Sequence, residues 1–240
     1  MATEVASSSP AVRLRVMSYN VHGQRDDVAA LTAVVRAVDP DVMIIQEGPR
    51  RFRWRYRCAA LAHRLGLVVA GGGLPALGNL LLTSLRVRVL ESWCVRYPLT
   101  SGRHLRGAVF ARCAVGRTRF ALAGTHLSTD AAERPGQARL FARKLAAVTE
   151  PVVVGIDVND EPGSAAWQAV ADGLIDAAVV GGAERAATFP AAHPQRRIDA
   201  LFVDPRIQVL RYEVMDTPET RRASDHLPVL AEIALVADAT

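Results

Sequence analysis

The sequence contains 240 residues, half of them hydrophobic, and carries a formal net charge of +5. Because no linker-like stretch divides it, we expect a single domain over residues 13–240 behind a disordered tail over residues 1–12. No apolar run reaches the ~18 residues that span a bilayer, and the first ten residues lack the basic start and apolar stretch of a secretory signal. The composition therefore argues against a membrane-spanning or secreted protein.

Strands outnumber helices in the predicted order of elements, and helices separate strands in each half of the chain. Alternating or short buried apolar runs predict strands over residues 13–20, 41–47, 79–83, 87–97, 105–114, 118–126, 151–157, 198–203, 207–214 and 227–235. Helical spacing predicts helices over residues 28–38, 51–65, 133–148 and 163–171, and Gly71–Gly73 predicts a flexible turn. This pattern predicts two mixed sheets packed face to face with helices outside.

Cysteine and arginine content bear on compartment and substrate. The three cysteines, Cys58, Cys94 and Cys113, are widely spaced and form no zinc or redox motif, so a reducing cytoplasm is expected. Lys144 is the only lysine, and arginine is the better bidentate binder of phosphate. An arginine-rich, lysine-poor composition is equally typical of a GC-rich genome, so the charge is compatible with a phosphorylated substrate without establishing one.

Polar side chains end several predicted strands, where loops can carry function on a rigid scaffold. Glu47 closes an apolar strand, where an unpaired carboxylate is expensive to bury, so it needs a cation or hydrogen-bond donors. Asp157 and Asn159 have a spacing of two, which points both side chains the same way in an extended backbone. Each also has a structural interpretation: an exposed strand-end acid for Glu47, and an Asx turn for Asp157 and Asn159.

The segment Ser224-Asp225-His226-Leu227 is the most specific of these features. Asp225 offers the oxygen ligand that Mg²⁺ prefers, and His226 can exchange a proton if a carboxylate orients it. Asp199 is the candidate orienter, because an aspartate within an apolar run is hard to explain by packing alone. Together with Asn20 and His126, which follow other strands, these residues predict one assembled hydrolytic site.

The ordered set of motifs resembles the endonuclease/exonuclease/phosphatase superfamily, the DNase I-like metal-dependent phosphoesterases. The motifs are Ser-Tyr-Asn-Val-His-Gly at 18–23, Gln-Glu at 46–47, Gly-Asn-Leu-Leu-Leu at 78–82, Thr-His-Leu at 125–127, Asp-Val-Asn at 157–159, Arg-Ile-Asp at 197–199 and Ser-Asp-His-Leu-Pro-Val at 224–229. The resemblance covers residues 13–235. It implies a four-layer α/β/β/α sandwich and hydrolysis of phosphoester bonds with Mg²⁺, for which Mn²⁺ can substitute.

The resemblance also implies roles around a metal ion and an attacking water. Glu47 corresponds to the principal metal ligand, and Asn20 and Asp225 lie close to the ion. Asp157 corresponds to the residue that positions the water, and Asn159 to the one that holds the phosphate.

Further roles follow for the histidines. His226 contacts or protonates the phosphoryl group and is oriented by Asp199, and His126 matches the second histidine of nuclease and phosphodiesterase members. Asn79 corresponds to a strand-end position near the site. The chain departs from the family at His22, where several DNA-repair members have an acid, and by one inserted residue before the Asp-X-Asn motif.

The substrate is less well defined by the sequence. Five arginines alternate with three aromatic residues in the run Arg-Arg-Phe-Arg-Trp-Arg-Tyr-Arg at 50–57. Such interleaving suits phosphate contacts and base stacking, which makes Arg51 and Arg53 candidates for substrate binding. The alternative is a solvated helix whose arginine stems cover apolar surface.

Three functions remain open from the sequence. The first is a metal-dependent phosphodiesterase or endonuclease that acts by in-line attack of water on a phosphoester substrate such as nucleic acid. The second is a phosphatase or phosphodiesterase of a small or lipid-derived phosphoester. The third is a non-catalytic binding module of the same fold. No obligate protein partner is expected.

Overall fold

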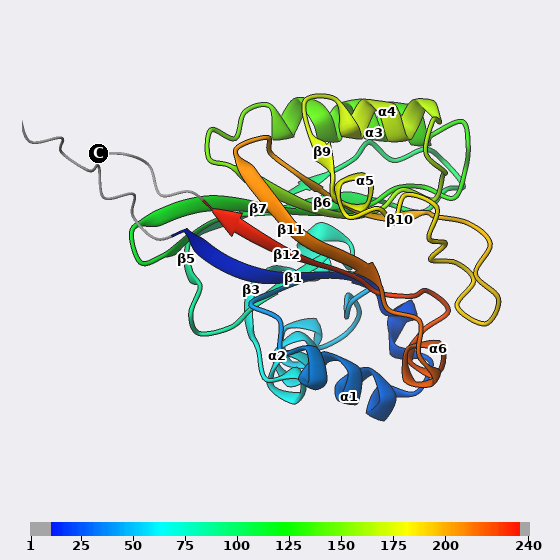
Figure 1. The fold of residues 1–240 in the computed structure, drawn as a ribbon. Coiled ribbons are helices and arrows are strands. Elements are labelled where there is room, and N and C mark those ends of the chain that lie inside the picture. Colours follow the sequence, from blue (N-terminus) through cyan, green and yellow to red (C-terminus); the bar gives the residue numbers. More distant parts are fainter. Residues whose placement is uncertain (1–10, 236–240) are drawn as a thin grey trace, which may run out of the picture.

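The computed structural model describes residues 11–235, and two six-stranded sheets pack against each other at its centre (Figure 1). The first sheet contains, in spatial order, β11 (Ile207–Val214), β12 (Val229–Leu235), β1 (Val12–Asn20), β2 (Val42–Gln46), β4 (Leu80–Thr83) and β3 (Val68–Gly72). The second contains β5 (Arg88–Arg96), β6 (Gly107–Val115), β7 (Thr118–His126), β8 (Val152–Asp157), β10 (Asp199–Val203) and β9 (Ile175–Asp176).

Helices cover the outer face of each sheet. On the first sheet lie α1 (Val28–Val38), α2 (Trp54–Leu65) and α6 (Pro218–Ala223), and on the second lie α3 (Arg134–Leu145) and α4 (Ala165–Ala171) (Figure 1). Short helices η1 (His22–Gln24), η2 (Leu74–Ala76) and α5 (Ala177–Val180) lie in connections. The predicted four-layer α/β/β/α sandwich is therefore confirmed.

The helix α1 illustrates why these segments are helical. Its buried residues recur at spacings of three and four, which gives one apolar face against the first sheet. The side chain of Asp27 accepts hydrogen bonds from the backbone N–H groups of Ala29 and Ala30, which caps the first turn. Asp39 adopts a left-handed conformation before Pro40, and the helix ends there.

The two sheets approach closely where glycines face Ile44. A Cβ added at Gly124 or Gly155 would lie 2.8 Å from side-chain carbons of Ile44, so only glycine fits at this spacing. Both glycines belong to strands next to the site, and their neighbours Leu122 and Val153 lie in the apolar core between the sheets. The ends of these two strands, which follow the glycines, are therefore fixed by tight packing between the sheets.

Each sheet contains one parallel pair of strands, and this pair determines where the strand ends meet. β1 runs parallel to β2, with Asn20 opposite Gln46, and β7 runs parallel to β8, with His126 opposite Asp157. β10 is antiparallel to β8 and begins with Asp199 opposite Asp157. Parallel strands need crossover connections, which α1 and α3 provide. The carboxyl ends of the two strands in each pair therefore lie side by side at the same end of the sheet.

Several elements differ from the sequence predictions. Gly71 and Gly72 belong to β3 rather than to a flexible turn, because β3 passes so close to β5 that a Cβ at Gly71 would lie 3.0 Å from the Ser92 side chain. Helix α2 begins at Trp54, after the first arginines of the alternating run. Most of the expected tail lies outside the described residues, and β1 begins at Val12.

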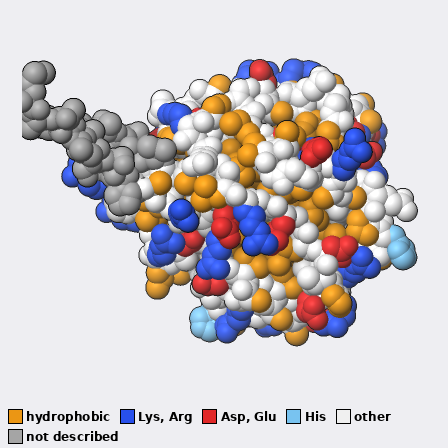
Figure 2. Space-filling model, viewed as in Figure 1, with side chains coloured by type: hydrophobic (Ala, Val, Ile, Leu, Met, Phe, Trp, Pro, Cys, Tyr) orange, Lys and Arg blue, Asp and Glu red, His pale blue; other side chains and the backbone are white. Residues whose placement is uncertain are grey.

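No helix within residues 11–235 is both long and apolar enough to cross a bilayer. The face shown in Figure 2 carries basic and acidic side chains interspersed with apolar ones, rather than one continuous basic field. Concentrated charge is found instead at the edge of the sheets where the strand ends meet.

Candidate active site

Strand periodicity explains why the polar residues face the same space. In β1, Leu14 and Val16 point into the core between the sheets, so Asn20 at the end of the strand points to the same side. The same alternation applies to His126 in β7, Asp157 in β8 and Asp199 in β10, whose same-side neighbours also belong to this core. These polar side chains thus continue the apolar layer between the sheets at its open edge.

Asp157 lies at the centre of this group and is fully buried, at 0 % exposure. Its Oδ2 accepts a hydrogen bond from Asn20 Nδ2 at 2.9 Å and lies 3.2 Å from His126 Nε2. Its Oδ1 accepts from the backbone N–H of Asn159 at 2.9 Å, and His226 Nε2 lies 3.9 Å from Oδ2. An ionised carboxylate is expensive to bury, and donors from both sheets offset that cost.

His226 is paired with a carboxylate on the side away from Asp157. Its Nδ1 lies 2.9 Å from Asp199 Oδ2, and the ring of Phe189 packs against it with centroids 4.7 Å apart. Burial alone would lower the pKa of His226, but Asp199, Asp157 and Asp225 outweigh burial and raise that pKa to about 10. The imidazole is therefore a cation at neutral pH, with Nε2–H directed towards Asp157.

His126 has the opposite surroundings. Arg106 Nη1 donates to His126 Nδ1 at 3.0 Å, and because a guanidinium cannot accept, Nε2 carries the hydrogen and faces Asp157. Burial and the charge of Arg106 lower the pKa of His126 to about 3, against the opposing effect of Asp157. Asn159 Nδ2 donates to the Leu127 carbonyl at 3.0 Å. Its 2.8 Å contact with Nε2 is not a hydrogen bond in this tautomer, because both nitrogens are donors. His126 is therefore neutral.

Glu47 and Asn159 are both held in left-handed backbone conformations, with φ of 56° and 55°. Such conformations are strained for non-glycine residues and often mark functional sites. The Glu47 carboxylate is 30 % exposed, and its Oε1 lies 3.9 Å from His126 Nδ1. The carboxylate of Glu47 therefore faces the cavity, and its oxygens can bind a further ligand there.

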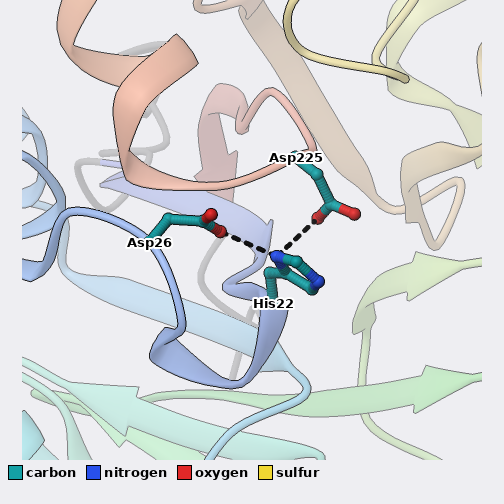
Figure 3. Close-up of side chains that lie close together, drawn as sticks. All are labelled: His22, Asp26 and Asp225. Atoms are coloured by element: carbon teal, nitrogen blue, oxygen red, sulfur yellow. Dashed lines mark hydrogen bonds and ion pairs between the residues drawn. The ribbon is translucent and has the colours of Figure 1, made fainter.

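His22 joins two acids at the rim of the site (Figure 3). Its Nδ1 lies 2.8 Å from Asp26 Oδ2 and 3.7 Å from Asp225 Oδ1. The backbone N–H of His22 donates to Asn20 Oδ1 at 3.0 Å, which fixes the amide of Asn20 with its Nδ2 towards Asp157. His22 thus links Asp225 to the strand end of Asn20.

A cavity of about 410 Å³ opens over these groups. Its walls include eight of the predicted positions together with residues from several connections: Asn20, Glu47, Arg51, His126, Asp157, Asn159, Asp225 and His226, with His22, Arg25, Arg50, His104, Arg106, Thr129, Phe189, Arg196 and Ile198. Asp199 lies behind His226 and acts on the cavity through it.

Two predicted substrate-binding residues lie elsewhere. Asn79 uses its amide Nδ2 to donate to the carbonyls of Ala76 and Gly107, both at 2.8 Å, and does not line the cavity. The guanidinium of Arg53 packs over the Tyr56 ring at 5.0 Å. Their predicted roles remain predictions, and the geometry offers them no direct contact with this cavity.

Arg106, Arg196 and Phe189 are site residues that the sequence analysis did not single out. Arg106 is 8 % exposed, and its buried Nε has no hydrogen-bond partner among the described residues. An unpaired buried donor is costly, and the guanidinium of Arg106 also places a positive charge in the wall of the cavity, which favours an anion there. The one signal for Arg106 in the sequence was its position just before the apolar run of β6. Many arginines at the start of a strand have no functional role, so this signal is weak.

The donor set suits a hard divalent cation. Glu47, Asp225 and Asn20 supply carboxylate and amide oxygens, the ligand types that Mg²⁺ prefers. A buried group also offers ligand atoms within 4.8 Å of one another: Asp157, Asp199 and His226. In that group the nitrogen Nδ1 of His226 is already engaged by Asp199 at 2.9 Å, so the oxygens nearer the opening are the better fit for Mg²⁺.

Solved structures share this fold at low sequence identity. A Bacteroides thetaiotaomicron endonuclease/exonuclease/phosphatase family protein matches with a TM-score of 0.78, 20% identity and coverage of 95% of this chain and 99% of its own. A mannosyl-6-phosphatase from the same organism matches with a TM-score of 0.75 and 18% identity, and the match covers 92% of this chain and 99% of that protein. D. rerio TDP2 in complex with a single-strand DNA product matches with a TM-score of 0.72 and 20% identity, and the match covers 92% of this chain and 98% of that protein. No curated protein gives a significant sequence match.

The family model for the Endonuclease/Exonuclease/phosphatase family matches residues 17–226, which includes every strand end that contributes to the cavity. The expected relationship is confirmed by this match and by the arrangement of the two sheets. The chain belongs to the Endonuclease/Exonuclease/phosphatase family and is a phosphoester hydrolase of that family.

Proposed function

We propose that this protein is a divalent-metal-dependent phosphodiesterase that cleaves a nucleotide-containing substrate by in-line attack of water. The single observation that carries the proposal is the arrangement around Asp157. This buried carboxylate faces one neutral and one cationic histidine, His126 and His226, at the base of a cavity rich in arginine. A base, donors and positive charge thus converge on one opening.

Each side chain around Asp157 has its own role in the proposed reaction. Asp157 accepts a hydrogen bond from the attacking water and aims it, because its own donors hold the carboxylate in place. The Nε2–H of cationic His226 donates to a phosphoryl oxygen, and Asp199 holds that ring in position. Asn159 and Arg106 add donors, so that negative charge developing on the phosphoryl oxygens meets fixed partners.

We assign the metal to Glu47, with Asn20 and Asp225 nearby, and Mg²⁺ as the ion that suits these oxygens, Mn²⁺ being able to substitute. When bound, such an ion supplies Lewis-acid stabilisation of the phosphoryl oxygens. The partly exposed carboxylate of Glu47 and its strained backbone support this assignment.

A nucleotide-containing substrate is favoured by the segment before α2. Phe52 is 87 % exposed and lies next in sequence to Arg51, a cavity residue. An exposed aromatic ring beside an arginine offers a stacking surface for a base next to a contact for phosphate.

A small phosphoester is the second candidate, because the cavity is small. Its volume of about 410 Å³ falls within the range of roughly 300–1,000 Å³ that holds small ligands. The mannosyl-6-phosphatase neighbour shows that the fold accommodates such chemistry in another protein. A sugar or lipid-derived phosphate therefore remains the alternative to a nucleotide.

The test is hydrolysis of bis-p-nitrophenyl phosphate beside single- and double-stranded DNA and RNA, with Mg²⁺, Mn²⁺ or EDTA. We expect metal-dependent turnover that is lost in Asp157→Asn, and faster cleavage of the nucleic acids. Metal-independent turnover, or turnover retained in the variant, would refute the mechanism. If none of these diesters is cleaved but a sugar phosphate assayed under the same conditions is hydrolysed, the second candidate replaces the first.

A further inference from the structure

A second cavity of about 240 Å³ adjoins the candidate active site and is unusually rich in arginine. It is lined by residues 23–25 from the connection after β1, residues 47–51 from the connection after β2, and Arg57 of α2. Four residues line both cavities, Arg25, Glu47, Arg50 and Arg51, so the two spaces share a wall.

We propose that this arginine pocket binds a second phosphate on the same substrate, next to the phosphoester that is cleaved. The inference rests on the proposed hydrolysis in the neighbouring cavity and specifies its substrate class: a nucleotide that carries two phosphates. Four arginines and one acid, Glu47, form the charged part of the lining.

These arginines have no carboxylate partners. Within residues 11–235, no acid lies at ion-pair distance from Arg25, Arg50, Arg51 or Arg57, whereas many arginines elsewhere are paired, such as Arg197 with Asp176 at 2.8 Å. Four cations around one small space repel each other, and an anion removes that repulsion. Arginine also presents the forked donors that bind phosphate at two points.

One of the four arginines, Arg50, is held in place by the surrounding backbone. Arg50 Nη1 donates to the Leu77 carbonyl at 3.0 Å, and a Cβ at Gly78 would lie 3.3 Å from Arg50 Cδ. The backbone N–H of Gly48 donates to the Gly78 carbonyl at 2.7 Å, which ties the pocket floor to the segment after η2. Gly78 itself has φ of 101°, a conformation that favours glycine.

The position of the pocket determines the kind of ligand. Glu47 lies on the shared wall, and its carboxylate would repel a phosphate unless a cation or the flanking arginines neutralise it. A phosphate held by Arg57 and Arg25 is therefore next to, and separate from, the one held over Asp157. Two phosphates on one sugar, or on neighbouring nucleotides, have this relationship.

The test compares p-nitrophenyl esters of thymidine that differ by one phosphate. The bisphosphate substrates are the esters of thymidine 3′,5′-bisphosphate on either phosphate, and the reference substrates are the corresponding esters of thymidine 5′- and 3′-phosphate. For at least one of the two positions we expect kcat/KM about 10-fold higher for the bisphosphate, the scale of one charge-assisted contact.

Arg57→Gln tests the pocket, since Arg57 lines only this second cavity. We expect it to lower the ratio of kcat/KM for bisphosphate over reference by about 10-fold. Arg55→Gln is the matched control: Arg55 lies on the same helix, is exposed, stacks over Trp54 and lines neither cavity. A wild-type ratio near one for both positions, or a ratio unchanged in Arg57→Gln, would overturn the inference.

Binding without turnover separates this inference from the proposed function. Calorimetry with thymidine 3′,5′-bisphosphate and thymidine 5′-phosphate in EDTA should give tighter binding of the bisphosphate, reduced by Arg57→Gln and not by Arg55→Gln. If no ester is cleaved but this difference holds, the catalytic proposal fails and the pocket stands. Equal binding of both ligands to the wild-type protein would refute the pocket. Tighter binding of 5′-phosphorylated dithymidine than of unphosphorylated dithymidine would show that the second phosphate can come from a neighbouring nucleotide of a strand.

Discussion

His126 and His226 are both buried beside Asp157, yet one is neutral and the other is a cation. His126 receives a hydrogen bond from Arg106 and is neutral, with a pKa lowered to about 3 by burial and by that guanidinium. His226 is paired with Asp199 and is cationic, with a pKa raised to about 10 although burial opposes this. The comparison teaches that the partner on the far side of the ring, rather than the shared Asp157, decides the charge.

This difference in charge gives the two histidines different roles as hydrogen-bond donors. A cationic ring donates a strong hydrogen bond to an anionic phosphoryl oxygen, and a neutral ring donates a weaker one without adding charge. The cavity thereby presents one mobile proton near Asp157, on His226, and a fixed donor on His126. Replacing one far-side partner at a time should shift the pKa of the histidine next to it towards that of the other histidine.

His226→Ala should have the largest effect. It removes the cationic donor, and we expect the kcat for bis-p-nitrophenyl phosphate with Mg²⁺ to fall by about 10²- to 10⁴-fold. His63→Ala, an exposed histidine of α2 that does not line the cavity, is the control and should retain full activity. Equal activity of the two variants would remove His226 from the mechanism.

Asp199→Asn should follow, with a loss on the order of 10²-fold at neutral pH, because the ring of His226 loses the partner that orients and charges it. The pH profile carries the sharper readout. We expect residual activity to increase as the pH falls, since acid restores the cationic form of His226. A pH profile identical to that of the wild-type protein would show that Asp199 does not control this proton.

Arg106→Gln should lower kcat by on the order of 10-fold, the scale of one charge-assisted hydrogen bond. It should also raise the pKa of His126, because the charge of Arg106 lowers it in the native protein. The chemical shift of His126 across a pH titration reports this directly. A His126 pKa that stays low in the variant would assign the effect to burial alone.

Stability should depend on the two histidines with opposite signs. His126 has a lowered native pKa, so its contribution to the free energy of unfolding is complete above about pH 6.5 and is lost as the pH falls towards 3. His226 has a raised native pKa, so its contribution is complete below about pH 6.5 and is lost as the pH rises towards 10. Each slope reaches at most about 1.4 kcal/mol per pH unit.

Urea unfolding from pH 5 to 9 measures these slopes. His126→Gln should flatten the acid side and His226→Gln the alkaline side, while His63→Gln should leave both unchanged. If the two site variants flatten the same side, the assignment of a neutral His126 and a cationic His226 is incorrect.

The sequence predicted the layers and most strand ends because both depend on period-two alternation. Asn20, His126, Asp157 and Asp199 each continue a run of residues that face the core between the sheets, so their common direction follows from the pattern. The side-chain roles implied by the family resemblance still require the measurements above.

The connections were not predictable in the same way. Phe189 and Arg25 reach the cavity from segments without a regular period, whose paths are determined by contacts far apart in the sequence. Gly71 was expected in a turn, but the close approach of another strand, rather than a turn, explains this glycine. Local patterns do not contain such information about tertiary contacts.

The most direct test of the central claim is a nitrogen-15 NMR titration of the histidine side chains in the metal-free wild-type protein, assigned with the two glutamine variants. We expect His126 to remain neutral with its hydrogen on Nε2 from pH 5 to 9, and His226 to remain doubly protonated over the same range. Two histidines that both titrate near pH 6.5 would contradict it.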